Sequence, residues 1–491
     1  MLLAIIGDLH LTESRKSLTF KIILPEALKA AQNGKADALI GIGDLTASGT
    51  EKQTYLLMSE LEKCPLPFYS TPGNAETRSQ CEKALAAQNI PPQGNIPVIF
   101  MDSSSSAVKE EDISKMDSLP ADSCFLLCSH YPPEMWQEKA KKSLAKAQER
   151  KAVTGIIAGH VHKDGEYTMR GLDPDKASGN PPAVVFMEQQ KDGSWKRREH
   201  ILEGMDPSLW SKEEKRSFLA MLGVSCMREP LETLEEAARL SIPVAELRYE
   251  ALDNMSKELF SAVEKWRKAG GKCLSLHLPN LRPDENSMDC DLAKGVHAAL
   301  LLSCDRVTLH VPEVTAADFP AKKNFLTENF VKLLTPLMEK NVVIAIENLH
   351  TKYQKWNDNE RNYGCTIEEC VSWIEHLKKV TAYGNIGFHC DIGHARNNVP
   401  FSIHEYMSDY YAEERLPFKG FHFHQIVKIE EYHFKNHFPL EGFYDKVIAL
   451  SGYFLARKKG VLPSDVPVIL EINTPGGSIK CYKKFLELIG S

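Results

Sequence analysis

Several features are missing from this 491-residue sequence, and each absence excludes a class of protein. Its twelve cysteines show no paired CxxC spacing, so we expect reduced thiols rather than a zinc knuckle or a disulfide scaffold. No apolar run reaches the length that crosses a bilayer, and the first one, at residues 2–7, has neither a basic flank nor a cleavage site. We therefore expect a cytoplasmic protein that makes no membrane contact.

Excess positive charge is also lacking, because the formal net charge of −7 gives no general attraction to a polyanion. The sequence contains no basic stripe interleaved with aromatic side chains, which disfavours nucleic acid as a partner without excluding a local basic groove. The chain is too long for one core and contains no low-complexity linker. We predict two domains, at residues 1–205 and 218–491.

Metal-ligand residue types follow a series of short apolar runs in the first half. Asp8 and His10 come directly after the run at residues 2–7, and Asp44 follows the run at 38–43. Later runs at 66–70, 124–129 and 154–158 lead to Asn74, His130, His160 and His162. Helical patterns at 17–33 and 51–63 separate the first strands. Because each group follows a strand and a turn, we expect all of them at one edge of a sheet sandwich.

This residue set suits a pair of divalent metals. Two metals about 3.5–4 Å apart need a bridging carboxylate, further nitrogen and oxygen ligands, and an open position for water or phosphate. Asp44 is the natural bridge and Asp8, His10 and His162 complete one site, while the second site uses Asn74, His130 and His160. We expect Asp44, Asn74 and His130 to be catalytic as well, because such a pair activates water for in-line attack on phosphorus.

The ordered motifs DLH, GD, GN, H and GHxH resemble the calcineurin-like metallophosphoesterase superfamily over nearly the whole first half. The resemblance implies an α/β/β/α fold, a β-sandwich with flanking helices, that binds two divalent metals (Mn, Fe or Zn) and a small-molecule phosphate ester. One position departs from the family pattern, since Ala75 fills the place of a histidine that assists the leaving group or the phosphoryl oxygen. We expect a slowed or redirected phosphoesterase, with a metal-binding pseudoenzyme as the alternative.

A segment rich in Gly, Pro and Asp follows the last motif, at residues 170–182, and indicates a loop. It is either a plain connection or a rim from which Arg170 or Lys176 reaches the substrate phosphate, because a guanidinium suits bidentate phosphate contact. Of the two, Arg170 is our candidate for substrate binding. The pattern at residues 191–198 predicts a turn with basic flanks.

Strand and helix patterns alternate through the second half. The predicted strands are residues 223–227, 244–248, 273–277, 307–310, 342–347, 386–391, 420–424 and 468–471. Helical patterns lie between them, at 231–240, 256–269, 291–302, 325–340, 367–380 and 444–458. Eight β/α units in about 270 residues predict a TIM barrel, a (β/α)8 fold whose function lies at the carboxyl ends of the strands.

These strand ends carry histidines and carboxylates, whose burial without partners costs roughly 1–3 kcal/mol each, and a metal centre supplies the partner. The order Glu, Asp-x-x-His, His, Glu resembles the xylose isomerase-like barrels, which include sugar isomerases and epimerases and the endonuclease IV class (AP endonuclease family 2). The resemblance implies one or more divalent metals (Zn, Mn or Mg) held by Glu347, Asp391, His422 and Glu471. It assigns Glu347 and Glu471 as catalytic carboxylates, and it places the extra metal positions of the endonuclease branch at His277, His310, His394 and His437.

Two departures limit this second resemblance. The endonuclease branch has an acid two residues before the last histidine, where this sequence has Lys435, which argues against a third metal. Glu246 and Arg248 are similar to positions in type I dehydroquinate dehydratases, but the threonine-x-arginine expected after the next strand is absent, so we set that family aside. His424, two residues beyond His422, is a candidate for substrate contact.

Three functions follow from these observations. The first, which the negative charge favours, is a metallophosphoesterase fused to a metal-dependent isomerase-like barrel, both acting on small phosphorylated or polyhydroxylated molecules. The second is a DNA-repair nuclease that pairs an exonuclease-like head with an abasic-site barrel, which the extra histidines favour. The third is a non-catalytic scaffold that binds metal.

Overall fold

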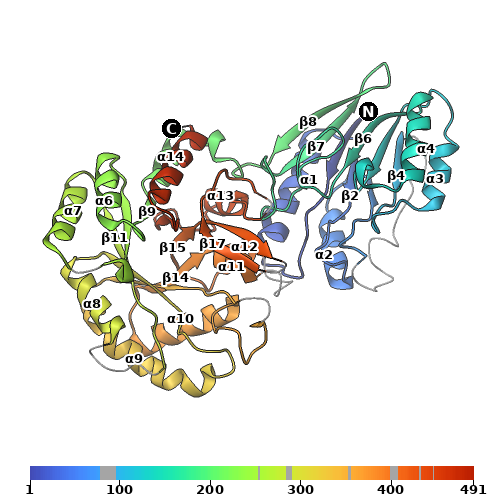
Figure 1. Cartoon of the computed structure of the whole chain (residues 1–491). Helices are drawn as coiled ribbons and strands as arrows, with labels where there is room; N and C mark the ends of the chain where they lie inside the picture. Colours follow the sequence, from blue (N-terminus) through green and yellow to red (C-terminus); the bar gives the residue numbers. More distant parts are fainter. Residues whose placement is uncertain are drawn as a thin grey trace. The chain divides into compact units, whose positions relative to one another are not determined.

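The computed structural model describes residues 1–77, 96–252, 255–283, 290–351, 355–398, 407–430, 433–445 and 447–490 (Figure 1). The chain divides into two compact units. The first contains Met1–Asp206 together with Tyr444–Ala456, and the second contains Pro207–Phe443 and Arg457–Ser491. Within the described residues, no helix combines the length and the apolar content that a bilayer span requires.

Two sheets face each other in the first unit. The larger has the strand order β3-β2-β1-β7-β8 and the smaller the order β4-β5-β6. Strands β1, β2 and β3 are parallel, whereas β7 pairs with β1 in the antiparallel sense. The strands are β1 (Leu2–Ile6), β2 (Ala38–Ile42), β3 (Phe68–Thr71), β4 (Val98–Met101), β5 (Phe125–Ser129), β6 (Val153–Ala158), β7 (Ala183–Gln189) and β8 (Trp195–Ile201).

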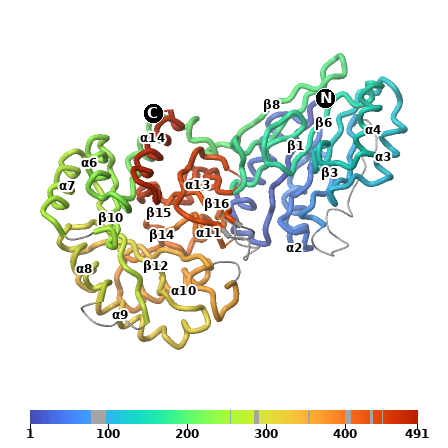
Figure 2. The backbone as a smooth tube through the Cα atoms, viewed as in Figure 1, coloured from blue at the N-terminus to red at the C-terminus, as the bar shows by residue number. Residues whose placement is uncertain are grey.

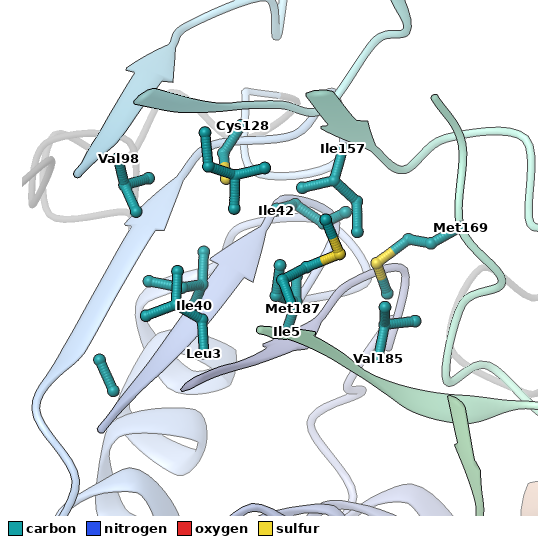
Figure 3. Packing of buried hydrophobic residues seen from close by; sticks show 12 residues of the cluster. Leu3, Ile5, Ile40, Ile42, Val98, Cys128, Ile157, Met169, Val185 and Met187 are labelled. Atoms are coloured by element: carbon teal, nitrogen blue, oxygen red, sulfur yellow. The ribbon is translucent and has the colours of Figure 1, made fainter. Parts of the chain in front are cut away.

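Apolar side chains from both sheets form the core between them. Figure 3 shows Ile5 and Ile42 of the larger sheet packed with Cys128 and Ile157 of the smaller one. A second cluster joins the other face of the smaller sheet to two helices, through Ile113 and Leu144. The helices of this unit are α1 (Leu24–Asn33), α2 (Glu51–Leu61), α3 (Glu110–Asp117) and α4 (Glu138–Glu149), with a π-helical turn at Thr19–Ile23 before α1. The expected layered sandwich with flanking helices is confirmed.

The second unit is a closed barrel of eight parallel strands, in the order β10-β11-β12-β13-β14-β15-β18-β9, so the predicted (β/α)8 fold is confirmed. These strands are β9 (Leu222–Ser225), β10 (Val244–Arg248), β11 (Cys273–His277), β12 (Arg306–His310), β13 (Val343–Glu347), β14 (Ile386–Asp391), β15 (Phe418–Phe423) and β18 (Val468–Leu470). A two-stranded ribbon follows β15 and consists of β16 (Gln425–Glu430) and β17 (His433–Phe438).

Helices alternate with the barrel strands, as the smoothed backbone in Figure 2 shows. They are α5 (Lys212–Leu219), α6 (Pro230–Arg239), α7 (Lys257–Lys268), α8 (Asp291–Leu301), α9 (Phe319–Glu339), α10 (Ile367–Thr381), α11 (Ile392–Asn398), α12 (Met407–Ala412) and α14 (Gly477–Ile489). Helix α13 (Ser451–Lys458) begins in the segment assigned to the first unit and ends in the second. The helices that follow β9, β10, β11 and β13 coincide with predicted helical patterns, with ends that shift by a few residues.

Three predicted elements differ from the structure. Residues 191–198 are not only a turn, because β8 begins at Trp195 and pairs with β7 along its length. Helix α9 begins at Phe319, six residues before its predicted start at residue 325, with Pro320 in the first turn, where the missing N–H costs nothing. The helix predicted at 444–458 forms only from Ser451 onward.

Candidate metal centres

The structure brings all seven predicted ligands of the first unit to one edge of its two sheets. They lie in loops that follow strands of both sheets, and backbone hydrogen bonds join the loops that carry them. The amide of Asp8 donates to Gly43 O at 3.0 Å, and that of His10 donates to Asp44 O at 2.9 Å. The loops that follow β1 and β2 are therefore fixed to each other.

Five of these seven residues have a left-handed backbone. The φ angles of Asp8, His10, Asp44, His160 and His162 are 46°, 48°, 48°, 72° and 54°. This conformation is uncommon for residues other than glycine and costs of the order of 1–3 kcal/mol each. Strain of this kind persists where the surrounding fold over-determines the position of a functional group. Its concentration at one sheet edge marks this edge as a site.

Asp44 faces two groups of ligands with its two carboxylate oxygens. Its Oδ2 lies 3.8 Å from His10 Nε2, which in turn lies 3.4 Å from His162 Nε2. Its Oδ1 lies 3.5 Å from His130 Nε2. Asp8 adjoins both groups, with Oδ1 at 3.8 Å from His162 Nε2 and at 4.0 Å from His130 Nδ1. The side chain of Asp44 is placed where a bridging ligand would be.

The second group is built around the amide oxygen of Asn74. Its Oδ1 lies 3.0 Å from His130 Nε2 and 3.0 Å from His160 Nδ1, and these two ring nitrogens are 3.3 Å apart. His130 Nδ1 lies 3.1 Å from Ile42 O, which can only accept, so Nδ1 carries the proton. In the neutral ring the Nε2 lone pair then faces two oxygen atoms, an arrangement that a cation between them stabilises.

Electrostatics around the first cluster also fit a bound cation. Burial raises the pKa of Asp8 well above its usual range, and the charge of Asp44 raises it further. Burial lowers the pKa of His162 well below its usual range, so this imidazole is neutral and its lone pair is available to a metal. Two crowded carboxylates among imidazoles, of which that of His162 is neutral, are the donor set of a divalent metal with mixed nitrogen and oxygen ligands.

Glu76 holds this edge together and was not among the predicted site residues. Its buried carboxylate accepts hydrogen bonds from the amides of Asp44 (2.8 Å), Thr46 (2.9 Å) and Gly73 (2.7 Å). The neighbouring Ala75 is fully buried, and its amide donates to Asp44 Oδ1 at 2.7 Å. The position where the family has a histidine thus orients the central carboxylate through its backbone.

The loop that follows β6 packs on the ligands, but not through Arg170. The guanidinium of Arg170 donates from Nε to Asp164 Oδ2 at 2.8 Å and from Nη1 to Pro181 O at 3.2 Å. Its predicted role in substrate binding stays a prediction, and these partners argue against it. The charge of Lys176 lowers the pKa of both Asp8 and His162, and its Nζ is 3.5 Å from Asp173 Oδ2.

In the barrel, strand register places the predicted ligands side by side. His277, His310, Glu347 and Asp391 are the last residues of β11, β12, β13 and β14. His310 is opposite Glu347, and Asp391 is opposite His422 of β15. Because the carboxyl ends of parallel strands meet at one end of a barrel, these groups share one face.

Glu347 is the centre of the barrel cluster. Its Oε2 lies 3.2 Å from His277 Nε2 and 3.3 Å from His422 Nδ1, and its Oε1 lies 3.4 Å from both His310 Nε2 and His394 Nδ1. Burial acts to raise the pKa of Glu347, but His310 and His422 hold it well below the usual range. The carboxylate is therefore ionised and shared by four imidazoles.

Three buried atoms of the predicted ligands beside Glu347 have no hydrogen-bond partner among the described residues. They are His422 Nδ1, His437 Nδ1 and Glu471 Oε2. Glu471 Oε2 lies 3.3 Å from His422 Nδ1 and 3.2 Å from His437 Nδ1. Buried polar atoms without partners are costly, so their convergence fits a metal that takes all three as ligands. The backbone of His437 is left-handed as well, with φ 66°.

Glu246 is a further residue that the sequence did not assign to the site. Its Oε1 lies 2.6 Å from His422 Nε2, and its Oε2 accepts from Ser275 Oγ at 2.6 Å and Thr308 Oγ1 at 2.8 Å. Because the carboxylate only accepts, His422 donates from Nε2, so Nδ1 is the nitrogen that faces the cluster, where a bound metal would take the place of a proton.

Two more histidines border the barrel cluster. His424 is fully buried, and its Nε2 lies 3.0 Å from both oxygens of Asp391. We infer that it orients this carboxylate, which differs from its expected contact with substrate. His350, which the sequence did not single out, packs on His394 with ring centroids 4.6 Å apart.

The barrel cluster opens into a cavity of about 400 Å³. Its wall includes five of the predicted ligands, which are His310, Glu347, His394, His437 and Glu471. A volume of this size accommodates a small metabolite. The candidate metal centre of the barrel is therefore accessible to a small ligand.

Comparison with known proteins places a family match over the residues of the first site. The model of the calcineurin-like phosphoesterase family matches residues 1–164, a range that contains all seven predicted ligands. Residues 1–164 thus match the calcineurin-like phosphoesterase family, as their motifs predicted. No curated protein sequence matches the chain.

Similar solved structures include a xylose isomerase domain protein from Alicyclobacillus acidocaldarius, with 13% identity over 55% of this chain and 98% of that chain and a TM-score of 0.39. Endonuclease IV from Thermus thermophilus has 15% identity over 55% of this chain and 99% of its own, with a TM-score of 0.37. A dimetal phosphatase from Danio rerio has 13% identity over 39% of this chain and 93% of its own, with a TM-score of 0.30.

Proposed function

We propose that the first unit is a dimetal phosphodiesterase for small molecules, and that the barrel is a metal-dependent isomerase or epimerase. The observation that carries the first assignment is Asp44, whose two oxygens face two separate groups of nitrogen ligands. We assign Asp8, His10 and His162 to one metal and Asn74, His130 and His160 to the other, with Asp44 shared. Mn, Fe and Zn all suit this donor set.

Bound divalent cations supply charge stabilisation for phosphoryl oxygens and lower the pKa of an attacking water. The residues of the chain hold this arrangement rigid: Glu76 fixes the loop of Asp44, and Asp44 in turn accepts from the amide of Ala75. Because Ala75 has no ionisable side chain, it cannot protonate a leaving group. This favours a phosphodiester whose leaving group departs without an acid.

Lys176 is the better candidate of the two loop cations for contact with the substrate phosphate. Both loop cations have an acidic partner, Asp164 for Arg170 and Asp173 for Lys176, but only the charge of Lys176 acts on Asp8 and His162. Its side chain is about one quarter exposed, at 23%. An ammonium group beside the cluster would bind a phosphoryl oxygen as a point charge.

In the barrel, we assign Glu347, Asp391, His422 and Glu471 to the central metal, with His277, His310, His394 and His437 around it. A metal here polarises a hydroxy-carbonyl pair of a sugar-like substrate. Glu347 and Glu471 border the cavity, so each is placed to move a proton at the substrate. Zn, Mn and Mg are the candidate metals.

The extra histidines around Glu347 favour one second candidate, an abasic-site nuclease. Against it, Lys435 stands two residues before His437 in place of an acid. Incision of an abasic-site duplex at low salt would support the nuclease, and its absence would leave the isomerase assignment.

The phosphodiesterase assignment is tested with bis(p-nitrophenyl) phosphate and the full chain supplied with Mn²⁺ or Zn²⁺. Asp44→Asn should lower kcat/KM by about a hundredfold or more, because several kcal/mol of charge stabilisation depend on the shared carboxylate. Glu138→Gln, on the exposed face of α4, is the matched control. Hydrolysis that persists in Asp44→Asn would contradict the assignment, and a wild-type chain that binds metal without hydrolysis would favour the scaffold.

A further inference from the structure

Arg248 stands where two cavities of the barrel meet. It is the last residue of β10 and lines both the cavity of about 400 Å³ over the metal cluster and a larger one of about 850 Å³. His437, a candidate metal ligand, also lines both cavities. A ligand that contacts the cluster therefore passes within reach of Arg248.

The partners of Arg248 leave part of its guanidinium available. Its Nη1 donates to Glu471 Oε1 at 3.0 Å, and its Nε lies 3.4 Å from Glu250 Oε2. No hydrogen bond of Nη2 is found within the described part of the chain. The side chain is 26% exposed, and this exposure lies at the cavities. A guanidinium with one open N–H edge is suited to a phosphate or carboxylate oxygen.

A second cation lines the same cavity. Lys355 follows β13 in the chain, whereas Arg248 ends β10. Strands β11 and β12 lie between β10 and β13 in the barrel order, and they end in the candidate ligands His277 and His310. The cavity is thus lined by candidate metal ligands and by two cations from different parts of the barrel, with Glu360 as a further acidic residue.

We propose that the barrel substrate is a small polyhydroxylated molecule with an anionic group, and that Arg248 binds this group. The proposal rests on the assignment of the barrel as a metal-dependent sugar enzyme. The cluster takes hydroxyl or carbonyl oxygens at one end of the molecule, and Arg248 takes phosphate or carboxylate oxygens at the other. A phosphate monoester is also the product class of phosphodiester hydrolysis, the reaction proposed for the first unit.

The simpler alternative is that Arg248 only neutralises Glu471. The two roles differ in selectivity between ligands that share a carbon chain and differ in charge. Glycerol, glycerate and glycerol 3-phosphate form such a set. If Arg248 binds the anionic group, its replacement weakens the binding of the two anions and leaves glycerol unchanged, whereas a purely structural arginine affects all three alike.

Isothermal titration of the full chain with these three probes, in an Asp44→Asn background that disables the first metal pair, tests the proposal. Arg248→Gln should raise the Kd for glycerol 3-phosphate by tenfold or more, because a charge-assisted contact is lost. Arg248→Lys keeps the charge and should lose less. Arg239→Gln is the matched control, since Arg239 pairs with Glu236 on the exposed face of α6.

A second measurement locates the contact. Phenylglyoxal labels accessible arginines, and peptide mass spectrometry reports Arg248 and Arg239 separately. Glycerol 3-phosphate should protect Arg248 but not Arg239, and glycerol should protect neither. Protection by the phosphate alone identifies a phosphate ester, and equal protection by glycerate identifies a carboxylate or phosphate site. Anion binding that is unchanged in Arg248→Gln, with no protection of Arg248, would overturn the proposal.

These readouts are independent of turnover. If neither unit shows catalysis but Arg248-dependent anion binding is present, the proposed function fails and the binding site stands. If the barrel isomerises a neutral sugar and anions bind no better than glycerol, the function stands and this inference fails.

Discussion

The hydrogen bond between Glu246 and His422 gives the sharpest test of the barrel centre. Glu246 accepts from Ser275, Thr308 and His422, and this fixes which nitrogen of His422 faces Glu347 and Glu471. Glu246→Gln keeps the shape of the side chain but removes its charge. One of its two polar atoms becomes a donor, so the hydroxyls of Ser275 and Thr308 must turn to accept from it.

The expected effect is a barrel that still folds but binds metal less tightly. Loss of an outer carboxylate behind a histidine ligand lowers metal affinity by about 10–100-fold, which corresponds to about 1.4–2.7 kcal/mol. Glu246→Ala would be less informative, because three buried donors would lose their acceptor at roughly 1–3 kcal/mol each, and unfolding would follow. The conservative replacement therefore isolates the effect on the metal.

Zinc affinity is measured by competition with a chromophoric chelator on the full chain, in the Asp44→Asn background so that the barrel dominates the signal. Glu264→Gln is the control, since Glu264 is an exposed residue of α7 that pairs with Lys268. Thermal unfolding of the chelated proteins checks that both variants fold equally. An unchanged zinc affinity in Glu246→Gln would refute the argument that this carboxylate prepares His422 as a ligand.

Two further predictions concern the first unit. Glu76→Ala removes the acceptor of three buried backbone amides, so it should destabilise the unit by about 3 kcal/mol or more and abolish phosphodiester hydrolysis, and Glu138→Ala should do neither in the same thermal-melting and kinetic assays. Gly171→Ala places a methyl group 2.6 Å from Asp8 Cβ and 3.1 Å from His162 Nδ1, so it should weaken metal binding, whereas Gly384→Ala meets no atom within 4 Å. A metal content equal to wild type in Gly171→Ala would show that this loop does not constrain the ligands.

Both folds were predictable because their strands carry the signal locally. The strand at Val244–Arg248 has the predicted bounds, and so do those at Cys273–His277 and Ile386–Asp391. Each is short, mostly apolar and ends in a polar residue, although Glu246, Ser275 and His389 interrupt the apolar pattern. Strand β8 was not predicted, because its side chains are mainly charged and at least half of its residues are exposed. The sequence therefore has no alternation of apolar and polar residues there.

The site was predictable as far as ligand motifs extend along the chain. Glu246 lies one strand from Ser275 and, in the other direction around the barrel, three strands from His422, and no local spacing in the sequence records their contacts. Glu76 follows the GN motif, but its importance comes from amides that it meets after folding. The availability of Arg170 for substrate depends on its contact with Asp164, and the composition of the loop does not predict that contact.

The assignment of Tyr444–Ala456 to the first unit has a consequence for how the gene can be divided. The amide of Gly179 donates to Tyr444 O at 3.0 Å. The same loop also contacts the candidate ligands of the first unit, because the amide of Asp173 donates to Asp8 O and the amide of Ser178 donates to His162 O. The codons for this supporting segment lie inside the reading frame of the barrel. A truncation after residue 206 therefore removes part of the phosphoesterase, and exchange of either half with a relative requires three breakpoints rather than one.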